Sequence, residues 1–347
     1  MKDSGAITVT GLIDLAAQSF GGKAIGTSDD FFAGMENLLL PGRGVFVAER
    51  HTENGKWMDG WESRRKRTPG HDWCILELGV AGKVQAVDID TNHFLGNNPA
   101  FASVDALWAP RGSSLDELVA RPWTEILGQV PLKPGSQNIC VVGSELAVSH
   151  LRLNIFPDGG VARFRAYGKV SPDWAHPELD DESRRYVTPG LVDLAAAMNG
   201  AVALAASDSF FAPMNNLLMP GRTVNQDGGW ETRRRRGPGN DWMIVQLGAR
   251  GTPSVIELDT LHFKGNFPHK ASIEGIDAPP GARVTDLIAS GDWSSLLEPL
   301  PLGAHNRHFF DSLRVHNPIT HLRLSIYPDG GLSRLRVWGR RELSPAE

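Results

Sequence analysis

"HLRLSIYPDGGLSRLRVWG", residues 321–339, alternates apolar and polar residues on both sides of a Pro-Asp-Gly-Gly turn. Leu322, Leu324 and Ile326 fall on one face of an extended chain, as a half-buried strand requires. Earlier in the chain, "HLRLNIFPDGGVARFRAYG" at 150–168 shows the same alternation around the same turn. Two alternating runs joined by a tight turn are typical of a β-hairpin. Both stretches therefore predict β-hairpins.

The hairpin stretch belongs to a duplication that covers most of the 347-residue chain. Four other pairs of stretches recur in the same order: 11–17 with 190–196, 28–43 with 207–222, 60–79 with 229–248, and 88–99 with 257–268. The offset falls from 179 to 169 residues because the first copy carries ten extra residues within 44–60. This period is far too long for a solenoid unit of roughly 20–50 residues, and each copy is long enough to form a domain.

The segment 169–187 separates the copies, is rich in proline and charge, and is typical of a linker. We place the boundary near residue 175, which gives one repeat over 1–175 and a second over 176–347.

Each repeat is expected to be mainly β. In the second copy, "DWMIVQLG" at 241–248 predicts a strand that Gly248 closes, and "SVIELDT" at 254–260 predicts another. Helical patterns are limited to 114–128 and 284–297, which predict short surface helices. Short strands joined by Gly- and Pro-rich turns predict two tandem β-sandwich domains related by internal duplication.

Composition restricts the function classes. Hydrophobic residues make up 41% of the chain, which is ample for a core, and the net charge of −5 argues against a general nucleic-acid binder. No apolar stretch is long enough to span a membrane, and the N-terminal residues do not resemble a secretion signal. Cys74 and Cys140 lack the spacing of a zinc site or disulfide framework. We therefore expect a cytoplasmic protein without nucleic-acid or membrane partners.

A cationic run occurs in both copies, as "GWESRRKR" from residue 60 and "GWETRRRR" from residue 229, each followed by an Asp-Trp pair. Such a run is often only a solvated surface. If it is extended, however, Glu231 and Arg233 face one way while Arg234 and Arg236 face the other. Arginine grips a carboxylate with two parallel hydrogen bonds, which favours an anion site. The predicted substrate-binding residues are Arg64, Arg65, Arg67 and Asp72, with Arg233, Arg234, Arg236 and Asp241 in the second copy.

A second motif, Asp-Thr-x-His-Phe-x-Gly-Asn, follows a predicted strand in each copy, where rigid scaffolds commonly carry sites. Its candidate residues are Asp90, His93 and Asn97, and Asp259, Thr260, His262 and Asn266. The alternative is a turn whose aspartate only caps its own backbone. A divalent metal is possible, but no third ligand is marked by spacing.

The stretch "FFAxMxNLLxPGR", at 31–43 and 210–222, adds polar residues to a mainly apolar segment. The Phe-Phe and Leu-Leu pairs are expected in the core. Asn216 could bind an amide-like ligand. The stretch also contains Arg43 and Arg222, to which the sequence pattern assigns no role. The chain contains neither a Gly-x-Ser-x-Gly elbow nor a phosphate-binding glycine loop.

Taken together and in order, these motifs resemble the allantoicase family over nearly the whole chain. The Asp-Trp strand and the final strand pair also resemble galactose-binding-like jelly rolls. The resemblance implies hydrolysis of allantoate to ureidoglycolate and urea, two jelly-roll sandwiches and a homo-oligomer. Allantoate carries one carboxylate and two ureido groups on one carbon, which suits the arginines and the Asp and Asn side chains.

For catalysis we expect an acid that protonates the departing urea nitrogen and a base that acts on water or the other ureido group. The candidates are Glu62 and His93, and Glu231 and His262. A metal that polarises the ureido carbonyl is the competing mechanism. The rival class is a non-enzymatic tandem jelly-roll protein that binds small acids or sugars. The ten-residue insertion, and Asn240 in place of His71, make the two sites unequal.

Overall fold

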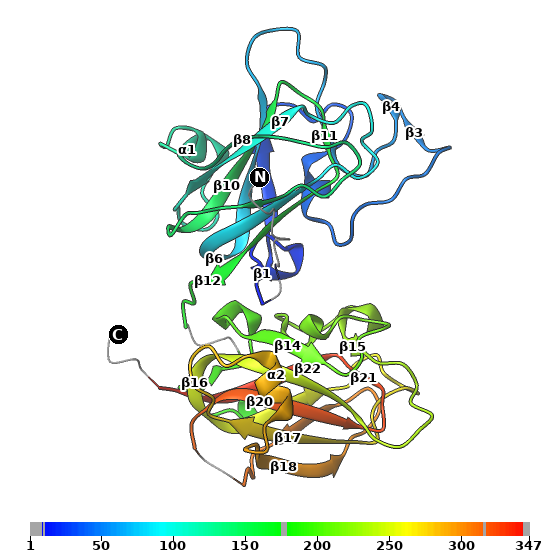
Figure 1. The fold of residues 1–347 in the computed structure, drawn as a ribbon, viewed down its shortest axis with the longest axis vertical. Coiled ribbons are helices and arrows are strands. Elements are labelled where there is room, and N and C mark those ends of the chain that lie inside the picture. Colours follow the sequence, from blue (N-terminus) through cyan, green and yellow to red (C-terminus); the bar gives the residue numbers. More distant parts are fainter. Residues whose placement is uncertain (1–8, 10, 175–178, 315–316, 343–347) are drawn as a thin grey trace. The chain divides into compact units, whose positions relative to one another are not determined.

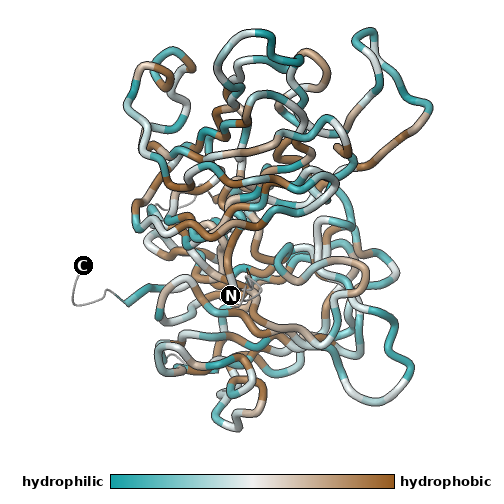
Figure 2. The backbone as a smooth tube through the Cα atoms, turned by 45° about the horizontal axis from the view of Figure 1, so that its top comes forward, coloured by the Kyte–Doolittle hydropathy of each residue, from teal (hydrophilic) through white to brown (hydrophobic). Residues whose placement is uncertain are grey.

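The structure is a computed structural model that describes residues 9, 11–174, 179–314 and 317–342. The chain divides into two compact units, Met1–Pro172 and Asp173–Glu347 (Figure 1). The boundary expected near residue 175 lies outside the described residues. Figure 2 shows that apolar stretches follow the central strands, whereas the hydrophilic stretches lie mainly in the connecting loops.

The first unit consists mainly of strands. Its elements are β1 Ile13–Asp14, η1 Gln18–Phe20, β2 Lys23–Thr27, η2 Met35–Leu39, β3 His51–Thr52, β4 Gly55–Lys56, β5 Trp61–Glu62, β6 Asp72–Asp90, β7 Phe101–Leu107, α1 Leu115–Val119, β8 Thr124–Pro131, β9 Ile139–Val141, β10 Ala147–Phe156, β11 Gly160–Val161 and β12 Arg163–Val170.

The second unit repeats this order, except that η6 stands in place of β3 and β4 and that η3 precedes its first strand. Its elements are η3 Ser183–Arg185, β13 Val192–Asp193, η4 Ala197–Asn199, β14 Val202–Ala206, η5 Met214–Leu218, η6 Gln226–Gly228, β15 Trp230–Glu231, β16 Asp241–Asp259, β17 Lys270–Ile276, α2 Val284–Ala289, β18 Ser294–Pro301, β19 Arg307–Phe310, β20 Ile319–Tyr327, β21 Gly331–Leu332 and β22 Arg334–Arg341.

One long strand organises each unit. In the second unit the order is β13-β22-β16-β20-β17-β18, with β14 and β19 also paired to β16. The first half of β16 pairs with β14 and β20, and its second half pairs with β22 and β19. The strand β6 does the same in the first unit, with the order β1-β12-β6-β10-β7-β8. Because the partners change halfway, each long strand passes from one layer of a β-sandwich to the other.

The predicted hairpins are wrong, although their strands exist. The apolar face is confirmed, because Leu322, Leu324 and Ile326 are fully buried. However, β20 and β22 do not pair with each other: both pair with β16, which lies between them. The Pro-Asp-Gly-Gly turn therefore connects the two layers rather than two neighbouring strands. The strands β10 and β12 are separated by β6 in the same way.

Gly248 does not end a strand, as we had expected, since β16 runs unbroken through both predicted strands. A Cβ atom at Gly248 would lie 2.1 Å from the carbonyl oxygen of Asn199. The glycine therefore permits a neighbouring backbone segment to cross close to the strand. It marks a close approach and not a turn.

Both predicted helices are too long. The helix α1 begins with a capping box between Ser114 and Glu117 and ends before Pro122, which cannot continue it. The last part of each predicted segment, 124–128 or 294–297, belongs to strand β8 or β18, and these strands pair with β7 and β17. Sheet pairing overrides the local helical pattern there.

The expected linker is also shorter than predicted. Of its described residues, Leu179 and Val187 pack against Leu191, Val255 and Trp338 of the second unit. The final part of the segment is therefore part of that unit's core.

A largely buried carboxylate in β1, that of Asp14, predicts a pH effect on stability. The Oδ1 atom of Asp14 accepts hydrogen bonds from the backbone N–H groups of Ala16 and Ala166, and burial raises the pKa of Asp14 from 3.8 to about 6. Because the folded pKa is raised, the ionised group destabilises the fold above pH 6, and this cost disappears as the pH falls toward 3.8. Asp14→Asn, which keeps the accepting oxygen, should therefore stabilise the protein at pH 7.5 by about 1–2 kcal/mol.

Urea unfolding of the wild type and the variant at pH 7.5 and pH 5 would measure this effect. The advantage of Asp14→Asn should shrink at pH 5, and an equal advantage at both pH values would contradict the explanation. The matched variant is Asp193→Asn, because Asp193 accepts from Ala195 and Val337 in the same way and burial raises its pKa.

Candidate active site

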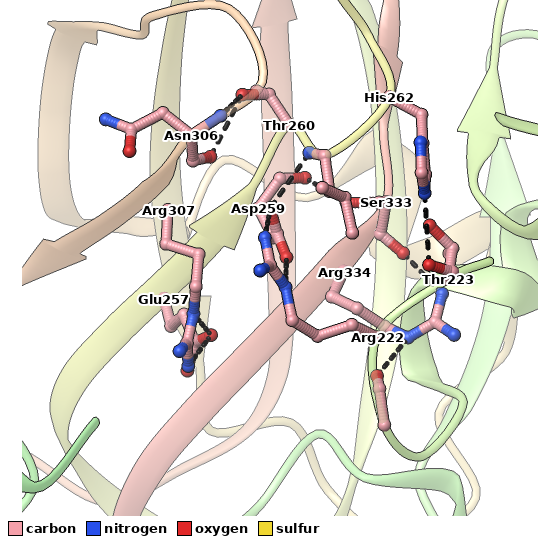
Figure 3. Close-up of polar contacts among 12 residues, drawn as sticks. Arg222, Thr223, Glu257, Asp259, Thr260, His262, Asn306, Arg307, Ser333 and Arg334 are labelled. Carbon is pink, nitrogen blue, oxygen red and sulfur yellow. Dashed lines mark hydrogen bonds and ion pairs between the residues drawn. The ribbon is translucent and has the colours of Figure 1, made fainter. Parts of the chain in front are cut away.

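The Asp-Thr loop begins where the long strand ends. In the second unit, the buried Asp259 carboxylate accepts hydrogen bonds from Arg222 Nε at 2.8 Å and Nη2 at 3.1 Å (Figure 3). Its Oδ1 atom also accepts from the backbone N–H of Leu261. The Arg222 side chain remains 45% exposed. The first unit has the same arrangement between Arg43 and Asp90, at 2.8 and 3.0 Å. Each aspartate thus fixes one guanidinium that still faces solvent.

Arg43 and Arg222 were not among our predicted site residues. The recurring Pro-Gly-Arg sequence was the available signal, but the partners lie 47 and 37 residues further along the chain. Conversely, Asp90 and Asp259 were predicted to bind substrate directly. Both carboxylates are instead occupied by arginine, so their role in the structure is to orient the guanidinium.

Thr260 ties the Asp-Thr loop to a second loop. Its hydroxyl donates to the carbonyl of Gly303 at 2.7 Å and accepts from the N–H of Asn306 at 2.9 Å. The side chain is fully buried. Thr260 therefore holds the two loops together and does not present its hydroxyl to a ligand.

His262 lies next on this loop in a left-handed backbone conformation, with φ of 72°. Its Nε2 atom lies 3.1 Å from the carbonyl oxygen of Thr223, and its N–H donates to His305 Nδ1 at 3.0 Å. Since a carbonyl only accepts, Nε2 carries the proton and Nδ1 keeps its lone pair in the neutral ring. In the first unit His93 has φ of 68°, and its ring lies 5.7 Å from that of Phe46.

A buried phenylalanine packs the loop against the short strand β21. Phe263 is fully buried, and a Cβ atom at Gly331 would lie 1.8 Å from its ring. From this loop, the side chain of Asn266 donates to Glu231 Oε1 at 2.6 Å. The fold therefore brings the Asp-Thr motif and the Gly-Trp-Glu motif together.

The glutamates of the two units have different surroundings. The Glu231 carboxylate accepts from Asn266 and, at 2.9 Å, from Gln226. The Glu62 carboxylate accepts from Asn97 at 2.8 Å, and burial raises the pKa of Glu62. A raised pKa keeps more of the acid form near neutral pH, as a proton donor requires.

The cationic run is not an extended strand beyond Glu231, since β15 ends there. Its first and third members are bound by acids. Arg233 pairs with Asp208 at 2.8 Å, and Arg235 pairs with the buried Asp241. Among the described residues, Glu231 pairs with no arginine, and its carboxylate accepts instead from the Gln226 and Asn266 amides.

The first copy follows the same pattern. Arg64 pairs with Asp29, and Lys66 pairs with Asp72, both at 2.6 Å. Asp72 and Asp241 therefore fix the run in place rather than face a ligand. The second and fourth members are exposed, namely Arg65, Arg67, Arg234 and Arg236.

The side-chain N–H groups of Asn216 are not offered to a ligand, because they donate to the carbonyls of Asp227 and Gly229. The buried Arg334 of β22 donates to the carbonyls of Gly221 and Gly228, which lie in the segment between η5 and β15. Burial lowers the pKa of Arg334 to about 10. These contacts shape the segment that carries Arg222.

A metal site is not formed by the predicted residues. Within residues 9, 11–174, 179–314 and 317–342, no group of three or more His, Cys, Asp or Glu side chains is placed to hold a metal. Both oxygens of Asp259 are bound by Arg222, so this carboxylate does not fit a ligand role. In the same part of the chain, no helix is long and apolar enough to cross a membrane.

Two jelly-roll repeats, each with a fixed arginine, a glutamate and a histidine on adjoining loops, define a tandem β-sandwich protein. Comparison with known proteins supports this class. The model of the family described as "Allantoicase repeat" matches residues 13–171 and 192–342. This chain belongs to the allantoicase family.

Relatives and solved structures agree with the family match. A probable allantoicase 2 of Burkholderia pseudomallei is 44% identical over 94% of both chains. A probable allantoicase of Acinetobacter baumannii is 43% identical over 94% of this chain and 93% of its own. The crystal structure of allantoicase from Saccharomyces cerevisiae is 34% identical, with a TM-score of 0.79, and covers 95% of this chain and 93% of its own. The fold class expected from the sequence is confirmed.

Proposed function

We propose that this chain hydrolyses allantoate to ureidoglycolate and urea. Family membership supports the reaction, and the observation that carries the site is the half-exposed Arg222 guanidinium fixed by buried Asp259. Arg222 Nε and one hydrogen of Nη2 donate to Asp259. Nη1 and the second hydrogen of Nη2 form the outer edge of the guanidinium, and this edge would bind the substrate carboxylate. Arg43 offers the same edge in the first repeat.

The ureido groups of allantoate would bind beside the glutamate. Glu231 and Asn266 lie within hydrogen-bonding distance of each other and together provide acceptors and a donor. The exposed Arg234 and Arg236, with Arg65 and Arg67 in the first repeat, would add positive charge around an anionic substrate. Holding the acid at one end and a ureido group at the other orients the carbon–nitrogen bond that breaks.

The reaction needs one proton donor and one proton acceptor. We assign the base to His262, since its Nδ1 lone pair can accept a proton from water while the water oxygen bonds to the central carbon. Glu231 donates a proton to the departing nitrogen, which takes the electrons of the broken carbon–nitrogen bond and leaves as urea. In the first repeat Glu62 and His93 have these roles, and the raised pKa of Glu62 suits an acid.

Urea release from allantoate by the purified protein tests the function. Binding of allantoate without urea release would support the rival class of non-enzymatic binding proteins. Exhaustive chelation provides a second result: loss of turnover that only added metal reverses would overturn the metal-free acid–base assignment.

The exposed arginines can be tested separately. Arg234→Lys and Arg65→Lys keep the charge but lose the planar fork, so we expect the more important of the two to lower kcat/KM for allantoate about tenfold. Arg283→Lys is the control, because Arg283 is an exposed arginine of the second unit that pairs with Asp286. If neither test variant differs from the control, the run does not bind substrate.

We further propose that the protein works in the cytoplasm as a homo-oligomer, with domains 1–175 and 176–347. The two thiols, Cys74 and Cys140, are both free, which fits a reducing compartment. Light scattering after gel filtration would measure the oligomer, and cell fractionation would measure the location.

A further inference from the structure

The two repeats differ at one position beside the Asp-Thr loop. In the second repeat the N–H of His305 donates to the carbonyl of Phe263 at 3.1 Å. In the first repeat the N–H of Gly135 donates to the carbonyl of Phe94 at 3.2 Å. Because these phenylalanines occupy the same place in their motifs, His305 and Gly135 are structurally equivalent.

His305 occupies a backbone conformation that favours glycine. Its φ is 53°, and that of Gly135 is 59°. Within the described part of the chain, positive φ at residues other than glycine occurs at His93, Trp174, His262 and His305. Two of these four, His93 and His262, are the candidate catalytic histidines, and His305 accepts a hydrogen bond from His262. Strained residues of this kind persist where the side chain serves a function.

The contact that His305 makes with its neighbour does not explain the strain. His305 Nδ1 accepts from the N–H of His262 at 3.0 Å. In the first repeat, however, His93 has nearly the same φ as His262 although glycine replaces His305. The loop therefore reaches its conformation without this imidazole. The imidazole ring of His305 is therefore a chemical group that the second repeat has and the first repeat lacks.

The hydrogen bond fixes which nitrogen of His305 carries the proton. Since Nδ1 accepts, the neutral ring bears its N–H at Nε2. The residue is exposed, and its ring lies 5.8 Å from that of His262 in an edge-to-face arrangement. In the first repeat the ring beside the equivalent histidine is Phe46, which offers no donor. The ring beside the assigned base therefore carries an N–H donor in the second repeat, whereas the corresponding ring in the first repeat carries none.

We propose that His305 contacts the substrate through Nε2–H, which donates to the carbonyl oxygen of a ureido group, and that most turnover occurs in the second repeat. This proposal rests on the proposed function. A donor at that oxygen would hold the ureido group while Arg222 binds the carboxylate. The site of the first repeat, with Gly135 and Phe46, would bind the same acid but turn it over more slowly.

Exchanging residues between the repeats tests this proposal. His305→Gly introduces the residue of the first repeat, and His305→Asn keeps an acceptor for the N–H of His262 but is too short to replace Nε2–H. We expect both to lower kcat/KM for allantoate about tenfold or more. The melting temperature of His305→Gly should stay unchanged or rise, because glycine relieves the strain.

The matched control is His308→Asn in the same loop. His308 Nε2 accepts from the N–H of Gly303, and its first-repeat equivalent, Asn138, accepts from the N–H of Lys133. This exchange preserves the structural contact, so activity should match the wild type.

Each other outcome has a distinct meaning. A wild-type protein that releases no urea would reject the proposed function itself. An active wild type with a fully active His305→Asn variant would show that His305 acts only through its backbone contact and overturn the proposal. A loss of no more than half the activity in His305→Gly would mean that the first repeat works equally well, which would overturn the assignment of turnover to the second repeat.

Discussion

Arg222→Lys should lower kcat/KM for allantoate about a hundredfold, by removing the fork that the structure fixes on Asp259. A lysine ammonium cannot bridge both carboxylate oxygens and still offer a planar edge to a second carboxylate. Losing a pair of charge-assisted hydrogen bonds that contributes about 3 kcal/mol corresponds to a fall in kcat/KM of about a hundredfold. Steady-state measurement of urea release across allantoate concentrations would test it, with the loss expected mainly in KM, because the interaction forms already in the bound substrate.

Arg250→Lys is the control for this variant. Arg250 makes hydrogen bonds of 2.8–3.1 Å to Asp277, so it is also a bidentate Arg–Asp pair of the second unit. It is not part of the candidate site, so its kcat/KM should equal that of the wild type. If Arg222→Lys were as active as this control, Arg222 would not bind the substrate carboxylate.

Gly331→Ala should destabilise the second unit by about 3 kcal/mol or more, because the new methyl group would lie 1.8 Å from the buried Phe263 ring. Neither the ring nor β21 can move without disturbing the Asp-Thr loop, so activity should fall as well. Thermal unfolding and urea release would measure the two effects. Gly265→Ala is the matched control in the same loop, since a Cβ atom at Gly265 meets no atom within 4 Å. Equal stability of the two variants would contradict the role given to Phe263.

The sequence predicted those parts of the fold that depend on local pattern. Alternation identified the buried faces of β20 and β22, and the duplication predicted two similar sandwiches. It did not predict strand partners, because pairing is a long-range property. The turn at 328–331 has hairpin residues, yet β16 lies between the strands it joins. Likewise, residues 294–297 have a helical pattern but pair with β17.

The candidate site was predicted in part for the same reason. Recurring motifs pointed to Glu231, His262 and Asn266, and the fold brings their loops together. Sequence spacing could not show that Arg222 is the partner of Asp259. It also could not show that the Asn216 amide donates to the backbone carbonyl of Gly229. His305 was missed altogether, because it lies outside the recurring stretches and its value comes from a difference between the repeats.

The shared strand has a mechanical consequence. Because β16 is hydrogen-bonded into both layers, neither layer can detach while the other stays intact. Amide protons of β20 and β22 should thus exchange with deuterium at a common slow rate, through one concerted opening. A single protease cut near residue 248 would divide that shared strand and let the halves exchange at separate rates.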